Sequence, residues 1–176
     1  FGTFIYLLIL YEIFKFFKIS FKLILFYLFI SYLCFGLYFF NFFDYLIFNI
    51  FVFSIIIFDS FSYLTGKFYG KNFIFKSISP KKTLEGYLGG FFFSNFFFIF
   101  FFFFTQVEIK ITLLIILVNF TIFISMIGDL IESYFKRINS IKDSSTYLPG
   151  HGGFFDRFDS FIASIIFLPL LSYLNL

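Results

Sequence analysis

The sequence predicts an all-α integral membrane protein with about six transmembrane helices. Long apolar stretches, a low content of charged residues and a biased placement of basic residues predict this class. Hydrophobic residues make up 61% of the chain and charged residues 13%, about half of the roughly 25% usual in soluble domains. Strands are excluded because open sheets cannot span a bilayer, and the stretches lack the alternation of polar and apolar residues that a barrel requires.

The lengths of the apolar stretches define the expected helices. A transmembrane helix needs about 20 apolar residues, and five stretches approach that length while a sixth, at the start of the chain, is incomplete. Because the first residue is Phe1 rather than Met, we expect a fragment or a processed product. The expected helices are residues 1–14, 21–40, 45–65, 84–104, 111–130 and 155–175.

Basic residues indicate how these helices are oriented. Lysine and arginine gather in the cytoplasmic connections of membrane proteins. Twelve of the thirteen basic residues fall in or beside alternate connections, and only Lys110 lies on the other side. We therefore expect the two long polar loops, residues 66–83 and 131–153, to share the cytoplasmic face. The twelve are Lys15, Lys18, Lys22, Lys67, Lys71, Lys76, Lys81, Lys82, Lys136, Arg137, Lys142 and Arg157.

Residue counts exclude several kinds of site. Cys34 is the one cysteine, which excludes an internal disulfide and a metal cluster of cysteine type. His151 is the one histidine, which excludes a zinc site with several histidines. The 40 Phe residues are interpreted as compositional drift. In stretches such as 91–93 and 96–98, Phe then stands where Leu or Val would serve equally well in lipid.

Acids and bases gather where the fifth helix ends and the sixth begins. Asp129, Glu132 and Lys136 share one face if the fifth helix continues past residue 130. Asp156 and Asp159 lie three residues apart at the start of the next helix. Carboxylates at a membrane boundary are costly unless they pair or bind a cation.

A divalent metal shared between Asp129 and Asp156 would remove that cost, and hard oxygen ligands favour Mg²⁺. The alternative is that the acids form salt bridges with Lys136, Arg137 and Arg157 at the membrane interface.

Three glycines, Gly150, Gly152 and Gly153, surround His151. Successive N–H groups in such a segment can form an anion-binding nest just ahead of a helix N-terminus, which also favours phosphate. The alternative is an ordinary turn between helices, in which His151 only satisfies a backbone carbonyl group.

The loop at residues 66–83 supplies further candidates. Lys81 and Lys82 precede the fourth helix, which Thr83 can cap, and can bind a triphosphate there. Simple retention of basic residues on the cytoplasmic side is the alternative. Asp59 lies inside the third helix, where an unpaired charge is expensive, so it is either functional or paired with a lysine.

Small residues at the start of the fourth helix indicate close packing. Gly86, Gly89 and Gly90 form a small-residue face there.

The polar segments together resemble a known family. They are Asp59 through Lys71, the run Ser-Pro-Lys-Lys-Thr-Leu-Glu-Gly at 79–86, and the segment 133–159, with Ser-Tyr-Phe-Lys-Arg, four residues, Lys-Asp, then His-Gly-Gly-Phe-Phe-Asp-Arg-Phe-Asp. In this order they resemble the phosphatidate cytidylyltransferases, or CDP-diacylglycerol synthases. Ser62 departs from the alanine usual in that family, and family members carry further helices before the first one here.

The resemblance implies a reaction and its participants. CTP and phosphatidate give CDP-diacylglycerol and pyrophosphate, with Mg²⁺ and room for a second, monovalent cation such as K⁺. It also implies a homodimer in the lipid bilayer and no nucleic acid partner. The implied metal ligands are Asp129 and Asp156; the implied catalytic residues are Lys142, Asp143, His151, Arg157 and Asp159; the implied substrate-binding residues are Asp59, Lys81, Lys82, Thr83, Glu85, Lys136, Arg137, Gly152 and Gly153.

We therefore expect one transmembrane catalytic domain over residues 1–176, N-terminally short relative to the family. We expect it in the bacterial inner (cytoplasmic) membrane with its active site facing the cytoplasm. In the reaction, Lys82, Arg137 and Lys142 would hold the leaving pyrophosphate.

Two other functions fit the residues less well. A CDP-alcohol phosphotransferase needs an upstream Asp-Gly pair and two aspartates separated by three residues; no Asp-Gly occurs, and Asp156 and Asp159 are separated by two. A transporter or assembly subunit would need polar residues near the middle of several spans, where we identify only Asp59.

Overall fold

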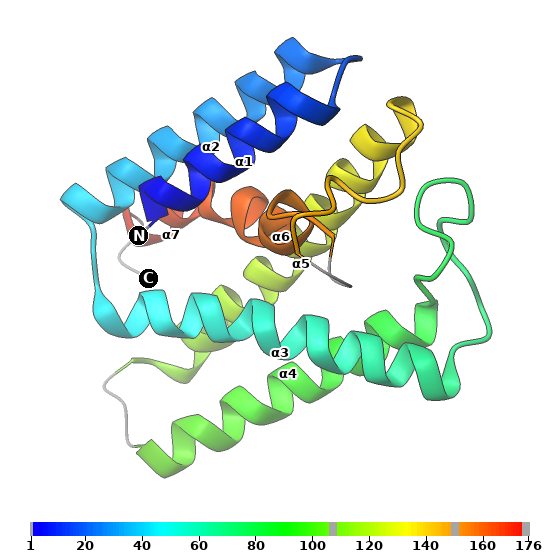
Figure 1. Ribbon diagram of the computed structural model, residues 1–176. Coiled ribbons are helices and arrows are strands. Elements are labelled where there is room, and N and C mark those ends of the chain that lie inside the picture. The colour runs from blue at the N-terminus through cyan, green and yellow to red at the C-terminus, as the bar shows by residue number, and fades with distance from the viewer. Residues whose placement is uncertain (1, 106–108, 149–151, 174–176) are drawn as a thin grey trace. The chain divides into compact units, whose positions relative to one another are not determined.

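The computed structural model describes residues 2–105, 109–148 and 152–173, and helices account for most of them (Figure 1). The helices are α1 (Gly2–Phe16), α2 (Phe21–Asn41), α3 (Tyr45–Tyr69), α4 (Leu84–Thr105), α5 (Ile111–Ile138), α6 (Phe155–Ile165) and α7 (Leu168–Tyr173).

The structure confirms the all-α membrane fold. Four helices, α2 to α5, are long and apolar enough to cross a bilayer. The incomplete first stretch forms α1, which is 15 residues long. Helix α5 continues to Ile138, beyond the expected end at residue 130. This extension carries Glu132 and Lys136 on the same helix as Asp129.

The expected single helix over residues 155–175 is wrong, because it is two helices. Helix α6 ends at Ile165, where Ile166 N donates to Ala163 O and Phe167 N to Ser164 O in a tightened last turn. Pro169 explains the break: its ring would collide with the Ile165 carbonyl in a continuous helix, and it has no N–H to donate. In the structure Pro169 lies in the first turn of α7, where proline is tolerated.

The chain divides into two compact units. One contains residues up to Phe42 together with residues from Ser125 to the end of α7, and the other contains residues 43–124. Helix α5 contributes its first half to the second unit and its last half, with Asp129, to the first. The single catalytic domain over the whole chain stays a prediction.

In the first unit, α1 and α2 lie side by side, and α2 also contacts α6 and α7 (Figure 1). The buried faces of α1, α2 and α6 form an apolar core together with Phe17, just after α1, and Phe135 of α5. A Cβ atom on Gly128 would lie 2.5 Å from the Ala163 Cβ, so α5 and α6 approach closely there. The core residues are Tyr6, Ile9, Ile13, Phe17, Ile24, Leu28, Phe135, Phe155 and Ile162.

In the second unit, α3 and α4 pack against each other through the predicted small-residue face (Figure 1). A Cβ atom on Gly86 would lie 2.8 Å from the Ser62 carbonyl oxygen, and one on Gly90 would lie 2.9 Å from the Phe58 carbonyl oxygen. Thr65 Oγ1 donates to the Gly86 carbonyl oxygen across this contact, at 3.2 Å. The expected packing role of these glycines is confirmed.

A pair of amides links α4 to α5 in the second unit. Asn95 Nδ2 donates to Asn119 Oδ1 at 2.8 Å, and Asn119 Nδ2 donates back to Asn95 Oδ1 at 3.0 Å. Asp59 is thus not alone as a polar residue within the spans, contrary to the prediction. Because the two side chains satisfy each other, they add no evidence for a transport path.

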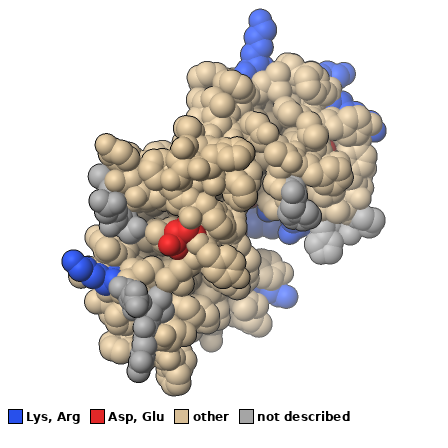
Figure 2. Space-filling view, turned by 90° about the vertical axis from the view of Figure 1, so that its left-hand side faces the viewer, with Lys and Arg blue, Asp and Glu red and all other residues tan. Residues whose placement is uncertain are grey.

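The surface is largely uncharged, as a bilayer requires. Figure 2 shows one face, on which most visible atoms belong to neither acidic nor basic residues. Phe92, Phe96, Phe103 and Phe104 are each more than 60% exposed on α4. Phe98 is 3% exposed and belongs to the core instead. The interpretation of the Phe-rich stretches as lipid-facing therefore holds for α4 with this exception.

Replacing Gly90 by alanine should loosen the α3–α4 contact. The new methyl group would press on the Phe58 backbone, and overpacking of this kind costs about 1–3 kcal/mol. Thermal unfolding in detergent micelles would measure the loss. Gly36→Ala is the matched control, because nothing lies within 4 Å of a Cβ atom there; equal destabilisation by both changes would contradict this account.

Replacing Asn95 by leucine should leave the Asn119 amide without its partner on α4. Hydrogen bonds between membrane helices contribute about 0.6–2 kcal/mol each, so the single variant should unfold at lower temperature. The double variant Asn95→Leu with Asn119→Leu should be less destabilised than the sum of the two single variants. Strict additivity would show that the pair contributes nothing as a pair.

Candidate catalytic site at the start of α6

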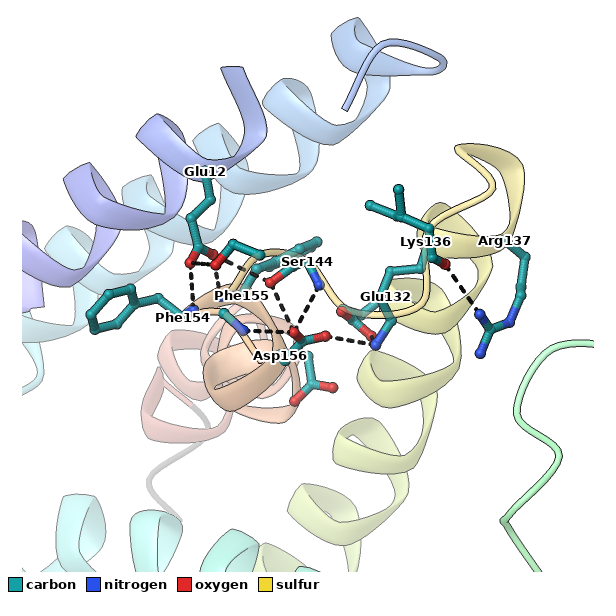
Figure 3. Close-up of polar contacts among 12 residues, drawn as sticks. Glu12, Glu132, Lys136, Arg137, Ser144, Phe154, Phe155 and Asp156 are labelled. Carbon is teal, nitrogen blue, oxygen red and sulfur yellow. Dashed lines mark hydrogen bonds and ion pairs between the residues drawn. The ribbon is translucent and has the colours of Figure 1, made fainter. Parts of the chain in front are cut away.

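The carboxylate of Asp156 joins three segments of the first unit (Figure 3). Asp156 lies in the first turn of α6, where a negative charge is favoured by the helix dipole. Its Oδ1 accepts from Lys136 Nζ on α5 at 2.7 Å. Its Oδ2 accepts from the backbone N–H groups of Ser144 and Gly153, both at 2.8 Å, and from Ser144 Oγ at 3.0 Å. Asp156 therefore fixes α5 and the α5–α6 loop to the start of α6.

These contacts keep Asp156 ionised. Asp156 lies outside the four long apolar helices, in a half-buried position. Burial alone would raise the pKa of its carboxyl group. Contacts with Glu132, the Gly153 N–H and Lys136, together with the Lys136 charge, outweigh burial and hold the pKa at about 2. The group is thus an anion at neutral pH.

Lys136 bridges two acids. Its Nζ lies 2.7 Å from Glu132 Oε2 and 2.7 Å from Asp156 Oδ1. The Glu132 side chain is 2% exposed, and its Oε1 is buried without a hydrogen-bond partner among the described residues. The alternative role for these acids, ion pairing with Lys136, is therefore realised for Glu132 and Asp156. One buried acceptor oxygen still faces no donor in the described chain.

Asp129 and Asp159 form a second acidic pair beside the first. Ser160 Oγ donates to Asp129 Oδ1 at 3.2 Å, and the Ser160 backbone N–H donates to Asp159 Oδ1 at 2.7 Å. The two aspartates also interact with each other, and Asp159 interacts with Glu132. The close approach of α5 to α6 at Gly128 explains why Asp129 meets this turn.

The glycines before α6 have defined conformational roles. Gly152 has a backbone φ of +81°, which residues with a side chain rarely adopt. A Cβ atom there would also lie 2.5 Å from Asp156 Oδ2. Gly153 N donates to Asp156, so this N–H is directed at a carboxylate in the structure. Gly150 and His151 lie outside the described residues, so the predicted role of His151 stays a prediction.

The remaining predicted residues of the first unit lie around this turn. Lys142 and Asp143 are exposed on the α5–α6 loop. Arg137 is exposed at the end of α5 and donates to the Ile141 carbonyl oxygen at 3.1 Å. Arg157 is exposed on the first turn of α6. Exposed cations of this kind are suited to meet an anionic ligand from solution.

The second unit holds the other predicted residues. Thr83 is buried and caps α4, since Gly86 N donates to its Oγ1 at 3.2 Å. The Glu85 carboxylate accepts from the backbone N–H groups of Lys71 and Asn72, both at 3.1 Å, and from Asn72 Nδ2 at 2.7 Å. Thr83 and Glu85 thus shape the loop before α4.

Two lysines follow on that loop, and one acid precedes it. Lys81 is exposed, and Lys82 is half-buried with its Nζ 5.8 Å from the centre of the Tyr87 ring. Asp59 is half-buried on α3. Their predicted binding of substrate stays a prediction.

Glu12 is the residue that the sequence analysis missed. It lies on α1 with 0% exposure and accepts four hydrogen bonds. The donors are Ser144 Oγ, Ser145 Oγ and the backbone N–H groups of Phe154 and Phe155 (Figure 3). One signal could have revealed it: Glu12 is the only charged residue in the apolar stretch 1–14, where a charge needs a partner.

The donor set is chemically suited to Mg²⁺. Carboxylate oxygens are the ligands this ion prefers, and the unpartnered Oε1 of Glu132 provides a further buried acceptor. Within residues 2–105, 109–148 and 152–173, no three acidic, histidine or cysteine side chains are arranged to hold a metal ion. Mg²⁺ is commonly bound by one or two carboxylates together with substrate phosphates and water. A site using Asp129 and Asp156 would therefore need oxygen ligands from its substrate.

Comparison with known proteins identifies the relatives of the chain. Phosphatidate cytidylyltransferase of Staphylococcus aureus is 40% identical over 116 residues, which are 66% of this chain and 44% of that protein. The enzyme of the same name from Staphylococcus saprophyticus is 43% identical over 119 residues, with the same coverage. That of Bacillus subtilis is 40% identical over 113 residues, which are 64% of this chain and 42% of that protein.

These matches cover less than half the length of the relatives. The model of the cytidylyltransferase family matches residues 1–174, which include every polar segment described above. The resemblance that the sequence carries is thus confirmed, and the chain belongs to the cytidylyltransferase family.

Proposed function

We propose that the chain carries the catalytic segment of a phosphatidate cytidylyltransferase, which transfers CMP from CTP to phosphatidate and gives CDP-diacylglycerol and pyrophosphate. The observation that carries this proposal is the convergence of Asp156, Lys136 and Glu132 at the start of α6, beside Asp129 and Asp159. Three of these five residues, Lys136, Asp156 and Asp159, lie in the segment 133–159 that resembles the family signature. The resemblance also implies Asp129 as a metal ligand, and helical spacing placed Glu132 on the same face as Asp129 and Lys136.

The chemistry explains why such a site needs both charges. A phosphate oxygen of phosphatidate attacks the α-phosphorus of CTP, the new P–O bond forms, and the bond to the β-phosphate breaks to release pyrophosphate. Two anionic groups must approach each other, so the barrier falls when cations neutralise them. We expect Arg137, Lys142 and Arg157, which are exposed around this turn, to bind the phosphates.

Asp129 and Asp156 would hold the Mg²⁺, which would neutralise the phosphates and polarise the reacting phosphoryl group. Lys136 orients Asp156 from its buried side, because its ammonium group is bonded to Oδ1. The Ser144 and Gly153 N–H groups fix Oδ2 of the same carboxylate. Asp156 is thereby held rigid before a substrate arrives, which reduces the ordering that binding requires.

The membrane setting suits a lipid substrate. The apolar helices make the chain a multi-pass membrane protein. The acyl chains of phosphatidate would therefore stay in the bilayer while its headgroup binds at the start of α6. The placement of the basic residues supports a site on the cytoplasmic side of a bacterial inner membrane. The homodimer and the monovalent cation stay predictions from the family resemblance.

Membranes that contain the chain should convert labelled CTP and phosphatidate into labelled liponucleotide with Mg²⁺, and chelation should abolish the product. Asp156→Asn should abolish it as well, because the substitution removes the anion that the site depends on. Asp44→Asn is the matched control, since Asp44 belongs to the second unit, where it caps α3 by accepting from Ile47 N. Activity that survives chelation would contradict the metal role; no product from the wild-type chain would contradict the function.

Replacing Lys136 by methionine should destabilise the first unit. The change leaves the Glu132 and Asp156 carboxylates without their shared cation, and breaking a buried ion pair in this way costs about 3–5 kcal/mol. The unfolding temperature and the rate of liponucleotide formation should both fall. Adding Glu132→Gln to Lys136→Met should restore part of the stability. Lys110→Met, at an exposed lysine, is the control; an equal loss in the two variants would refute the bridging role.

A further inference from the structure

We propose that Glu12 is a positioning residue for Asp156, through which α1 holds the α5–α6 loop in its working conformation. This inference rests on the proposed function and adds a residue outside the signature segment 133–159. The two carboxylates share a hydrogen-bonding network in the first unit, although 144 positions separate them in the sequence.

Glu12 first fixes the start of α6. The N–H groups of Phe154 and Phe155 donate to its Oε1 and Oε2 at 2.8 and 2.9 Å. These are among the N–H groups that a helix start leaves without partners in the helix. The next residue along the chain is Asp156, so the position of Glu12 determines where the first turn of α6, and with it the Asp156 carboxylate, begins.

Glu12 also fixes the loop that holds Asp156 from the other side. Ser145 Oγ donates to Glu12 Oε1 at 2.6 Å, and Ser144 Oγ lies 3.4 Å from Glu12 Oε2. The same Ser144 hydroxyl lies 3.0 Å from Asp156 Oδ2. A hydroxyl group has one proton to donate. Ser144 can therefore donate to only one of the two carboxylates at a time, and its shorter distance is to Asp156, so a change at Glu12 alters the competition for this one proton.

Close packing leaves this arrangement little freedom. A Cβ atom on Gly153 would lie 2.6 Å from both Glu12 Oε1 and Ser145 Oγ, so the Glu12 carboxylate rests on the peptide whose N–H donates to Asp156. Ile9 and Ile13, one turn before Glu12 and just after it, are each 0% exposed in the core of the unit. Glu12 thus lies on a helix whose neighbouring residues are packed in the core of the unit.

A substitution at Glu12 should disturb the site more than the fold. Residues that orient a metal ligand from behind typically change metal affinity or activity by about 10- to 100-fold when they are replaced. The test compares Glu12→Gln, which keeps the shape and removes the charge, with the conservative Glu12→Asp. Tyr6→Phe is the matched control, because it removes a buried hydrogen bond that the same helix makes to Ser31 of α2. Ser31 donates in turn to the Ile162 carbonyl oxygen of α6, which lies beyond residues 152–158.

Two readouts on the purified full chain decide between positioning and a merely structural role. The first is amide hydrogen exchange at residues 152–158 relative to α2. The second is the Mg²⁺ concentration that gives half-maximal liponucleotide formation per folded enzyme. For Glu12→Gln we expect faster exchange confined to residues 152–158 and a rise of about tenfold or more in half-saturating Mg²⁺, with partial recovery in Glu12→Asp and neither change in Tyr6→Phe.

The opposite results would overturn the proposal. Unchanged exchange would show that Glu12 does not hold the loop, and faster exchange with unchanged half-saturating Mg²⁺ would show a structural role only. If Glu12→Gln failed to fold, Ser145→Ala would remove a single donor from Glu12 and should give a smaller shift in the same two readouts. If the wild-type chain formed no liponucleotide, the proposed function would fail, while unchanged exchange in Glu12→Gln would independently refute the hold of Glu12 on the loop.

Discussion

The structure around the start of α6 depends on one requirement: a carboxylate that is partly removed from water must be surrounded by hydrogen-bond donors and a cation. Asp156 meets it with two backbone N–H groups, one hydroxyl group and the ammonium group of Lys136. These donors come from α5 and from two places on the loop that follows it. Because so many segments must converge on one side chain, satisfying its charge also determines the path of the chain between α5 and α6.

The same requirement organises α1. Its one acid lies among apolar residues, and the groups that satisfy it come from the loop and from the unpaired N–H groups at the start of α6. Outside residues 149–151, which the structure does not describe, the loop contains no helix and a single isolated bridge, between Leu148 and Gly152. Side chains such as Glu12 and Asp156 therefore accept the hydrogen bonds that a sheet or helix would otherwise provide. The carboxylates of the buried Glu12 and the half-buried Asp156 thus replace secondary structure as the framework of this segment.

The sequence predicted the long helices well because the length of each apolar stretch can be counted directly along the chain. The starts of α2, α3, α4 and α5 fall where the apolar stretches start. It failed at 155–175, where apolar character continues across Pro169 and hides a backbone break. It did not reveal the roles of Glu12, Asn95 and Asn119, because the hydrogen-bond partners of these residues are distant in the sequence and close only in the folded chain. The signature residues were found because their order along the chain is itself distinctive.

Gly152 sets a limit on how far this sequence can drift. On the lipid-facing side of α4, one large apolar residue replaces another at little cost, and Phe has accumulated there. At Gly152 the backbone has φ +81° and the Asp156 carboxylate fills the space that any side chain would need. The turn at Gly152 therefore does not accept the exchange of side chains that exposed apolar helix positions accept, because a single added methyl group would displace the anion on which the site is built.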